Sequence, residues 1–199
     1  MTEVATVAPG FLISGPQLED PNFAETLVLM AQFNQEGALG FVVNRPATID
    51  LETLLENVDE DLAKLARESG LGSHDVLVGG PVQQTAVWLL FHRSDEELEG
   101  DEGEDILGVG EHLAVAATRD ILEDFVSGRR AGPFHVILGY AGWGPGQLEL
   151  ETHAGAWLPL GLTEDLVFDV PFEERWDEAL RRLGLTPGGF MISGSGAEA

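Results

Sequence analysis

One stretch of the sequence joins two expected β-strands through a glycine-rich loop: Tyr140-Ala141-Gly142-Trp143-Gly144-Pro145-Gly146-Gln147-Leu148-Glu149-Leu150-Glu151. Within it, Pro145-Gly146 predicts a type II turn, because proline presets φ and glycine tolerates the positive φ of the following position. The large amphipathic ring of Trp143 either anchors a ligand or partner or folds down over its own hairpin. The stretch therefore predicts a rigid hairpin and leaves two roles open for its tryptophan.

Polar and apolar side chains alternate after this turn, which predicts a second strand. Leu148 and Leu150 then face the core, while Glu149, Glu151 and His153 share the other face. Two carboxylates and one imidazole at this spacing can bind a divalent metal or place an acid beside a base. The same alternation is typical of a half-exposed strand. A weakly specified metal-assisted hydrolase is one hypothesis for this segment, and a solvated strand face is its alternative.

Strand and helix patterns follow one another without the regular βαβ order of a doubly wound sheet. Nine short apolar stretches have strand character: 11–14, 26–32, 39–43, 76–78, 86–92, 113–117, 134–140, 147–152 and 166–170. Three helices are expected from apolar stripes over 51–65, 121–126 and 172–183, with Asp50 and Thr118 as N-caps of the first two. Because many connections are too short for a crossover helix, we predict an α+β fold with a mostly antiparallel sheet.

Composition favours a single globular domain over residues 1–199, since 44% of the residues are hydrophobic. The absence of cysteine excludes disulfides, thiolate nucleophiles and Cys-ligated metal centres. The N-terminal residues lack the basic region of a signal peptide, and no apolar run reaches the length of a membrane span. We therefore expect a cytoplasmic protein with no membrane partner.

The chain is strongly acidic, with 35 Asp and Glu against ten Lys and Arg and a formal net charge of −25. Lys64 is its only lysine. Eight of the twelve residues in 94–105 are acidic, so this run is predicted to be a mobile solvated loop, and the small, acidic tail 193–199 is expected to fray. The charge reflects either adaptation to a salt-rich cytoplasm or a GC-rich genome combined with one acidic loop.

Two further segments carry candidate binding groups. Gly79-Gly80 follows a strand, and the two glycines either present their backbone amides to an anion or form a tight turn of the chain. The residues that would complete a P-loop do not follow them. Asn44 suits a turn, and Arg45 either clamps an anionic group or pairs with one of the many carboxylates. The five histidines show no metal-ligand spacing, and His92 and His135, which lie in apolar strands, are expected to be hydrogen-bonded core residues.

Several motifs occur along the chain in one order: Gly10-Phe11-Leu12-Ile13, Asp20-Pro21-Asn22-Phe23, the segment from Gly37 to Pro46, Gly79-Gly80-Pro81-Val82, Arg119-Asp120-Ile121-Leu122, the segment from Gly139 to Glu151, Trp157, and Arg175-Trp176 with Ala179-Leu180. With these motifs the chain resembles the YqgE/AlgH family of small bacterial proteins, over about residues 10–184. The string that runs from Gly139 to Glu149 is the most specific of them.

The resemblance implies a bifurcated, mostly antiparallel β-sheet curled into a pseudo-barrel, with about three flanking helices. It carries over no catalytic residue and no cofactor. The AlgH name refers to a proposed role in regulating alginate production, and some members are described as transcriptional regulators. This chain departs from the family in its acidity and in its 94–105 run, and both features argue against direct binding to nucleic acid.

Three classes of function follow: a non-catalytic ligand- or protein-binding regulatory protein, which we favour, a metal-assisted hydrolase, and a direct DNA-binding regulator. For the first class we expect that the protein binds an unknown small ligand or protein partner and that it is a monomer or a weak homodimer. Its candidate binding residues are Asn44, Arg45, Gly79, Gly80, Tyr140, Trp143, Gln147, Glu149 and Glu151.

If the charge is a salt adaptation, the free energy of unfolding should rise steeply as KCl increases to molar concentration, because screening relieves repulsion within the compact state. Urea denaturation at low and molar KCl measures this dependence. A flat response would favour the genomic explanation.

Overall fold

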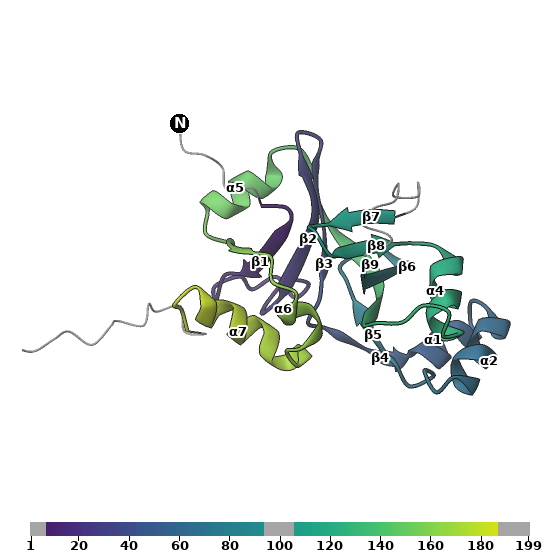
Figure 1. Ribbon diagram of the computed structural model, residues 1–199. Helices are drawn as coiled ribbons and strands as arrows, with labels where there is room; N and C mark the ends of the chain where they lie inside the picture. The colour runs from purple at the N-terminus through teal and green to yellow at the C-terminus, as the bar shows by residue number, and fades with distance from the viewer. Residues whose placement is uncertain (1–6, 94–105, 187–199) are drawn as a thin grey trace, which may run out of the picture.

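The computed structural model describes residues 7–93 and 106–186 (Figure 1). Its described part has an α+β fold in which a ten-stranded, mostly antiparallel sheet curls into a half-barrel with helices around it. The predicted fold class is confirmed, although six α-helices rather than about three lie in these residues. The predicted mobile run 94–105 and the tail 193–199 lie outside the described residues.

The elements follow one another in a mixed order. The strands are β1 (Gly10–Ser14), β2 (Leu27–Asn34), β3 (Gly37–Val42), β4 (Pro46–Asp50), β5 (Asp75–Val78), β6 (Val82–His92), β7 (Ile106–Val109), β8 (Leu113–Ala116), β9 (Phe134–Trp143) and β10 (Trp157–Gly161). The helices are α1 (Leu51–Glu56), α2 (Glu60–Glu68), α4 (Arg119–Val126), α5 (Gln147–His153), α6 (Asp165–Phe168) and α7 (Arg175–Arg182), with a 3₁₀ turn η1 (Phe172–Glu174).

Strand β9 belongs to both parts of the sheet. The sheet has the order β10-β1-β2-β3-β9-β6-β8-β7, and β5 pairs with β9 as well. The first half of β9, over 136–138, lies parallel to β5, whereas its last residues, 141–143, pair with 38–40 of β3. Strand β6 pairs antiparallel with β9 at the same time. The sheet therefore divides along one edge of β9, as the resemblance implies.

Three glycines allow the chain to cross β9 where the sheet divides. The short connection from β5 to β6 passes from one partner of β9 to another, and a Cβ on Gly80 would lie only 2.3 Å from the carbonyl carbon of Tyr140. A Cβ on Gly79 would lie 2.5 Å from the Gly139 oxygen. Gly139 itself has a φ of 69°, which a residue with a side chain adopts at a cost. Only glycine fits this crossing without displacing backbone.

Three clusters of buried side chains fill the space around the sheet. One cluster lies on the face covered by α6 and α7 and includes Phe11, Phe41 and Trp176. A second joins α1, α2 and α4 to the opposite face of β6, β8 and β9. A third packs α5 against β1, β2 and β3. Each helix group in Figure 1 thus covers its own region of the divided sheet.

The structure corrects two of the predicted elements here. The stripe over 51–65 forms two helices, because the Asp59 side chain accepts the Leu62 amide and begins α2 after a break. Residues 166–170 were predicted as a strand, which is wrong: α6 occupies 165–168 and buries the adjacent pair Leu166 and Val167. Strands β4, β7 and β10 were not predicted. Within the described ranges, no helix is long and apolar enough to cross a membrane.

A histidine and an arginine meet in the core beneath α6. The His135 side chain is 8% exposed, and its Nε2 donates to the Val167 carbonyl at 2.7 Å. The Arg175 guanidinium is buried beside it and donates to the carbonyls of Val170 and Val43. Burial lowers the pKa of His135 to about 4, with a smaller contribution from the positive charge of Arg175. The imidazole is therefore neutral in the folded protein.

Acid should destabilise the protein through His135. The unfolded state binds this proton below about pH 6.5, while the folded state resists it down to about pH 4, so stability is complete above pH 6.5 and falls through this window. The expected loss from His135 between pH 7.5 and 5 is about 2 kcal/mol. Urea denaturation at both pH values measures it.

The variant H135Q keeps a donor for the Val167 carbonyl but does not titrate, so it should flatten this part of the pH dependence. Burial also lowers the pKa of His74, so the stability of H135Q should still fall with acid, but less steeply than that of the wild type. An equal slope in H135Q and the wild type would contradict the assignment.

Candidate functional site

The segment after the predicted turn is a helix rather than a strand. Gly146 has a φ of 74°, and the Gln147 amide donates to the Gly144 carbonyl at 3.1 Å, which confirms the turn. From there α5 continues, so the strand predicted over 147–152 is wrong. Leu148 is buried and Leu150 is 74% exposed, because residues two apart lie on different sides of a helix. Alternation over so few residues did not distinguish the two structures.

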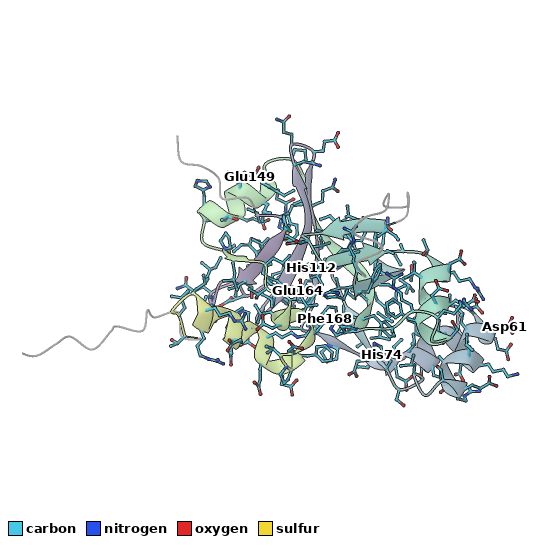
Figure 2. The ribbon with its side chains drawn as sticks, viewed as in Figure 1. Asp61, His74, His112, Glu149, Glu164 and Phe168 are labelled. Carbon is cyan, nitrogen blue, oxygen red and sulfur yellow. The ribbon has the colours of Figure 1, made fainter. Side chains whose placement is uncertain are left out.

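This change separates the carboxylates that the metal hypothesis placed together. On α5, Glu149 and His153 are one turn apart, and the His153 ring contacts the Glu149 backbone oxygen at 2.8 Å. Glu151 points to another side of the helix, where it contacts Trp143. Within the described part of the chain, no three His, Asp or Glu side chains lie close enough together to bind a metal ion. Figure 2 shows Glu149 on α5, away from His74 and His112.

The Glu151 carboxylate holds two buried indoles in place. Its Oε2 accepts the indole N–H of Trp143 at 2.9 Å and that of Trp157 at 2.8 Å, and its Oε1 accepts the Gln147 side-chain amide at 2.8 Å. A buried indole N–H needs an acceptor, and an ionised one forms the stronger bond. Trp143 is only 6% exposed, so its ring folds inward and is not an exposed anchor. Gln147 and Glu151 support this packing.

Asn44 and Arg45 hold the loop that precedes β2. Arg45 donates to the carbonyls of Pro21, Asn22 and Ala24, at 2.7 to 2.8 Å. Asn44 accepts the Leu27 amide and donates to the Glu25 carbonyl, both at 2.9 Å. Arg45 therefore bonds backbone oxygens rather than the carboxylate that we expected as its alternative partner.

The same loop also contacts the two tryptophans, through Phe23. The Phe23 ring lies 6.2 Å from that of Trp143 and 5.3 Å from that of Trp157. The motifs around residues 20–23, 44–46 and 143–151 thus meet around one loop, although they lie far apart in the sequence.

Gly79, Gly80 and Tyr140 lie at the division of the sheet. The Gly79 amide donates to the Leu138 carbonyl at 2.7 Å, so it is engaged within the sheet. The Tyr140 ring packs edge-on against Trp88 at 6.2 Å. The nine predicted site residues therefore fall in three places and do not line one pocket. Asn44 and Arg45 bond the loop before β2, and Gly79, Gly80 and Tyr140 lie at the division of the sheet. The other four lie on α5 or against it: Trp143, Gln147, Glu149 and Glu151.

Both strand histidines are hydrogen-bonded, but the prediction that both are core residues is confirmed only for His135, because the His92 side chain is 39% exposed. His92 Nε2 lies 2.9 Å from Glu164 Oε2, and the ring stacks on His112 with 5.7 Å between centroids. Figure 2 places His112 and Glu164 next to each other in this part of the molecule. His135 bonds the Val167 carbonyl as described above.

An apolar groove lies between the pair α1 and α2 and the start of α4, over the face of β6. Its volume is about 290 Å³, and its lining residues are Leu55, Val58, Asp59, Leu62, Val87, Leu89, Ala117, Thr118, Arg119 and Leu122. The Val58 side chain at its margin is 66% exposed. This groove combines apolar surface with space for a partner.

Sequence reasoning missed the groove because it assigned Val58 to a continuous core stripe. The residues Asn57 to Asp59 end one helix and begin the next, which turns Val58 outward. Asp59 as an N-cap was the signal available in the sequence, since aspartate caps helices well.

Ion pairs occupy the polar margin of the groove. Arg119 Nε donates to Asp59 Oδ2 at 2.6 Å, and the same guanidinium pairs with Glu123. The hydrogen bond from Arg119 lowers the pKa of the Asp59 carboxyl. Asp59, Arg119 and Glu123 thus pair with one another, so the part of the groove that remains for a partner is apolar. It consists of Val87 and Leu89 on β6, which form the floor, and of Leu55, Val58 and Leu62 on the α1 and α2 side, which form the wall.

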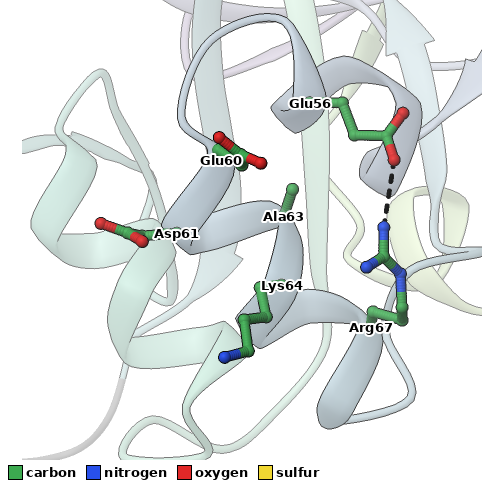
Figure 3. A pocket seen from close by; sticks show the side chains of 6 residues that line it. All are labelled: Glu56, Glu60, Asp61, Ala63, Lys64 and Arg67. Carbon is green, nitrogen blue, oxygen red and sulfur yellow. Dashed lines mark hydrogen bonds and ion pairs between the residues drawn. The ribbon is translucent and has the colours of Figure 1, made fainter.

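A second hollow, of about 370 Å³, lies along α1 and α2 and is almost entirely charged (Figure 3). Arg67 pairs with Glu56 at 3.0 Å, while Lys64 lies 3.9 Å from Glu68. Exposed pairs of this kind contribute little free energy. The hollow is therefore a solvated helix face, and the apolar groove is the better candidate site.

The fold describes an α+β protein with a divided half-barrel, in whose described part no cluster of His, Asp and Glu could hold a metal ion. A family model described as AlgH-like matches residues 11–188, and the chain belongs to this family. A UPF0301 protein of Anaeromyxobacter sp. strain Fw109-5 is 52% identical over 97% of this chain and 96% of its own. A UPF0301 protein of Nitrosococcus oceani is 37% identical over 88% of each.

Two solved structures share the fold. The solution structure of the AlgH protein from Pseudomonas aeruginosa has a TM-score of 0.74 and 31% identity, and the match covers 100% of this chain and 99% of that one. The crystal structure of DIP2367 from Corynebacterium diphtheriae has a TM-score of 0.67 and 18% identity over 88% and 86% of the two chains. The second likeness shows the fold alone.

Removing the Glu151 carboxylate should destabilise the protein. The variant E151A leaves two buried indole N–H groups without their acceptor, at a cost of about 2 to 4 kcal/mol. E151Q keeps an acceptor oxygen but loses the charge, so its cost should be about 1 kcal/mol. Urea denaturation gives these differences, and E149A is the matched control on the same helix, expected within about 0.5 kcal/mol of wild type. Equal effects of E151A and E149A would refute the role assigned to Glu151.

Proposed function

We propose that this chain is a non-catalytic binding protein that acts in the cytoplasm and regulates a protein partner through the groove between α1, α2 and α4. The observation that carries the proposal is the exposed side chain of Val58 beside an apolar floor formed by Val87 and Leu89. Binding energy at protein interfaces concentrates where apolar anchors enter such hollows.

The groove suits side chains of a protein better than an enclosed small ligand. Its volume of about 290 Å³ lies at the lower end of the range for small-molecule pockets. It also lacks the convergent polar groups that orient a small ligand, because Asp59 and Arg119 bond each other.

The other two hypotheses receive less support. A hydrolase would need Glu149, Glu151 and a histidine together, and α5 separates them. A DNA-binding surface would need free cations, whereas five arginines of the described chain pair with carboxylates: Arg67, Arg119, Arg129, Arg181 and Arg182. The net charge of −25 also opposes a phosphate backbone.

Peptides selected from a random displayed library against the wild-type protein should identify the groove. We expect V58D to weaken their binding at least about tenfold, because a carboxylate replaces an apolar contact. The matched control L150D adds the same charge at an exposed leucine on α5 and should leave binding unchanged. Fluorescence anisotropy with each variant gives the dissociation constants. Selected peptides that bind V58D as well as wild type would place the interaction elsewhere.

A further inference from the structure

We infer that the partner segment is a cationic amphipathic helix, an inference that rests on the groove proposed above as the binding site. Three observations support it: the shape of the groove, the charges beside it, and the net charge of the chain. The shape points to a helix, and the two charge observations point to a basic partner.

The shape of the groove favours a helix. Its floor comes from the side chains of Val87 and Leu89, which lie two residues apart on the same face of β6. In the part of β6 where Leu89 lies, β8 and β9 occupy both edges, so an added strand has no free edge there. An occupant must lie on the face of the sheet, between the helices.

The wall of the groove is apolar and lies beside the break between two helices. Leu55 lies near the end of α1 and Leu62 in the first turn of α2, and Val58 lies at the break between them, where its side chain is exposed. Apolar side chains along one face of a partner helix can pack against such a wall and against the floor on β6. The groove therefore suits the apolar face of a helix that lies over the sheet.

The charges near Val58 favour a basic partner. Glu60 and Asp61, in the first turn of α2, are exposed, and neither forms an ion pair with another residue in the described ranges. Figure 3 shows both carboxylates on α2, apart from the paired Glu56 and Arg67. Both carboxylates line the charged hollow rather than the groove, but they lie in the turn of α2 that also carries the groove residue Leu62. Lysine or arginine on the polar side of a bound helix can pair with them from there.

The net charge of the chain also favours a basic partner over a second copy of this chain. A charge of −25 attracts cationic segments over long range and speeds their association. A second copy of this chain carries the same charge and would be repelled, so self-association is not the occupant that we infer. Because attraction alone would bind any cationic peptide, the test must separate the apolar contact from the charge.

Three synthetic peptides of about 14 residues, or four helical turns, separate these effects. The first places leucine on one helical face and lysine on the other. The second has glutamate in place of each lysine, and the third has serine in place of each leucine. Fluorescence anisotropy at about 50 and 500 mM salt gives the dissociation constants, and circular dichroism reports helix formation on binding.

We expect the leucine–lysine peptide to become helical on binding and to bind at least about tenfold more tightly than either of the others. V58D should weaken it at least about tenfold and L150D should not. The double variant E60K/D61K should weaken it more than E36K/E174K, which makes the same change of charge at exposed carboxylates elsewhere.

The outcomes distinguish this inference from the proposal beneath it. Equal binding of the leucine–glutamate peptide, with the same loss in V58D, would overturn the basic partner and leave the groove intact. If the leucine–lysine peptide bound V58D as tightly as the wild type, the attraction would come from charge alone, and this would also overturn the inference. The groove itself fails only if the library peptides are insensitive to V58D as well.

Discussion

Strand β9 is the constraint on which this structure depends, because it is paired with β5 and β6 in its first half and with β3 at its end. That pairing requires the chain to cross β9 between β5 and β6, and the crossing requires glycine at 79, 80 and 139. The divided sheet then has faces that need separate cover. The helices α1, α2 and α4 bury one of them and leave the apolar groove where the first two helices break.

The motifs that mark the family support this scaffold. Arg45 bonds the backbone of the loop before β2, and Phe23 of that loop packs on the tryptophans that the Glu151 carboxylate fixes. A string such as Gly139 to Glu151 is therefore specific to the fold, and Gly139, Gly146, the indole of Trp143 and the Glu151 carboxylate carry structural roles. The proposed partner surface lies at another site, on the mainly apolar side chains of the groove between α1, α2 and α4.

The sequence predicted the fold class, the turn at Pro145-Gly146 and most of the central strands, since apolar runs and glycine–proline pairs act locally. It did not predict α5, because Leu148 and Leu150 alternate as they would in a strand and only packing against β1 to β3 decides between the two. The groove could not be predicted from periodicity, because Val58 continues the stripe of α1 in sequence but not in space. The clamp on residues 21 to 24 depends on Arg45, which is remote in the chain.

Native-state hydrogen exchange of the β9 amides tests most directly whether this one strand joins both parts of the sheet. If it does, the amides at 136–138 and those at 141–143 should exchange with the same free energy, equal to that of global unfolding, as denaturant is added. Separate free energies for the two halves, with one half opening below the global value, would show that the parts of the sheet unfold independently and would contradict the account.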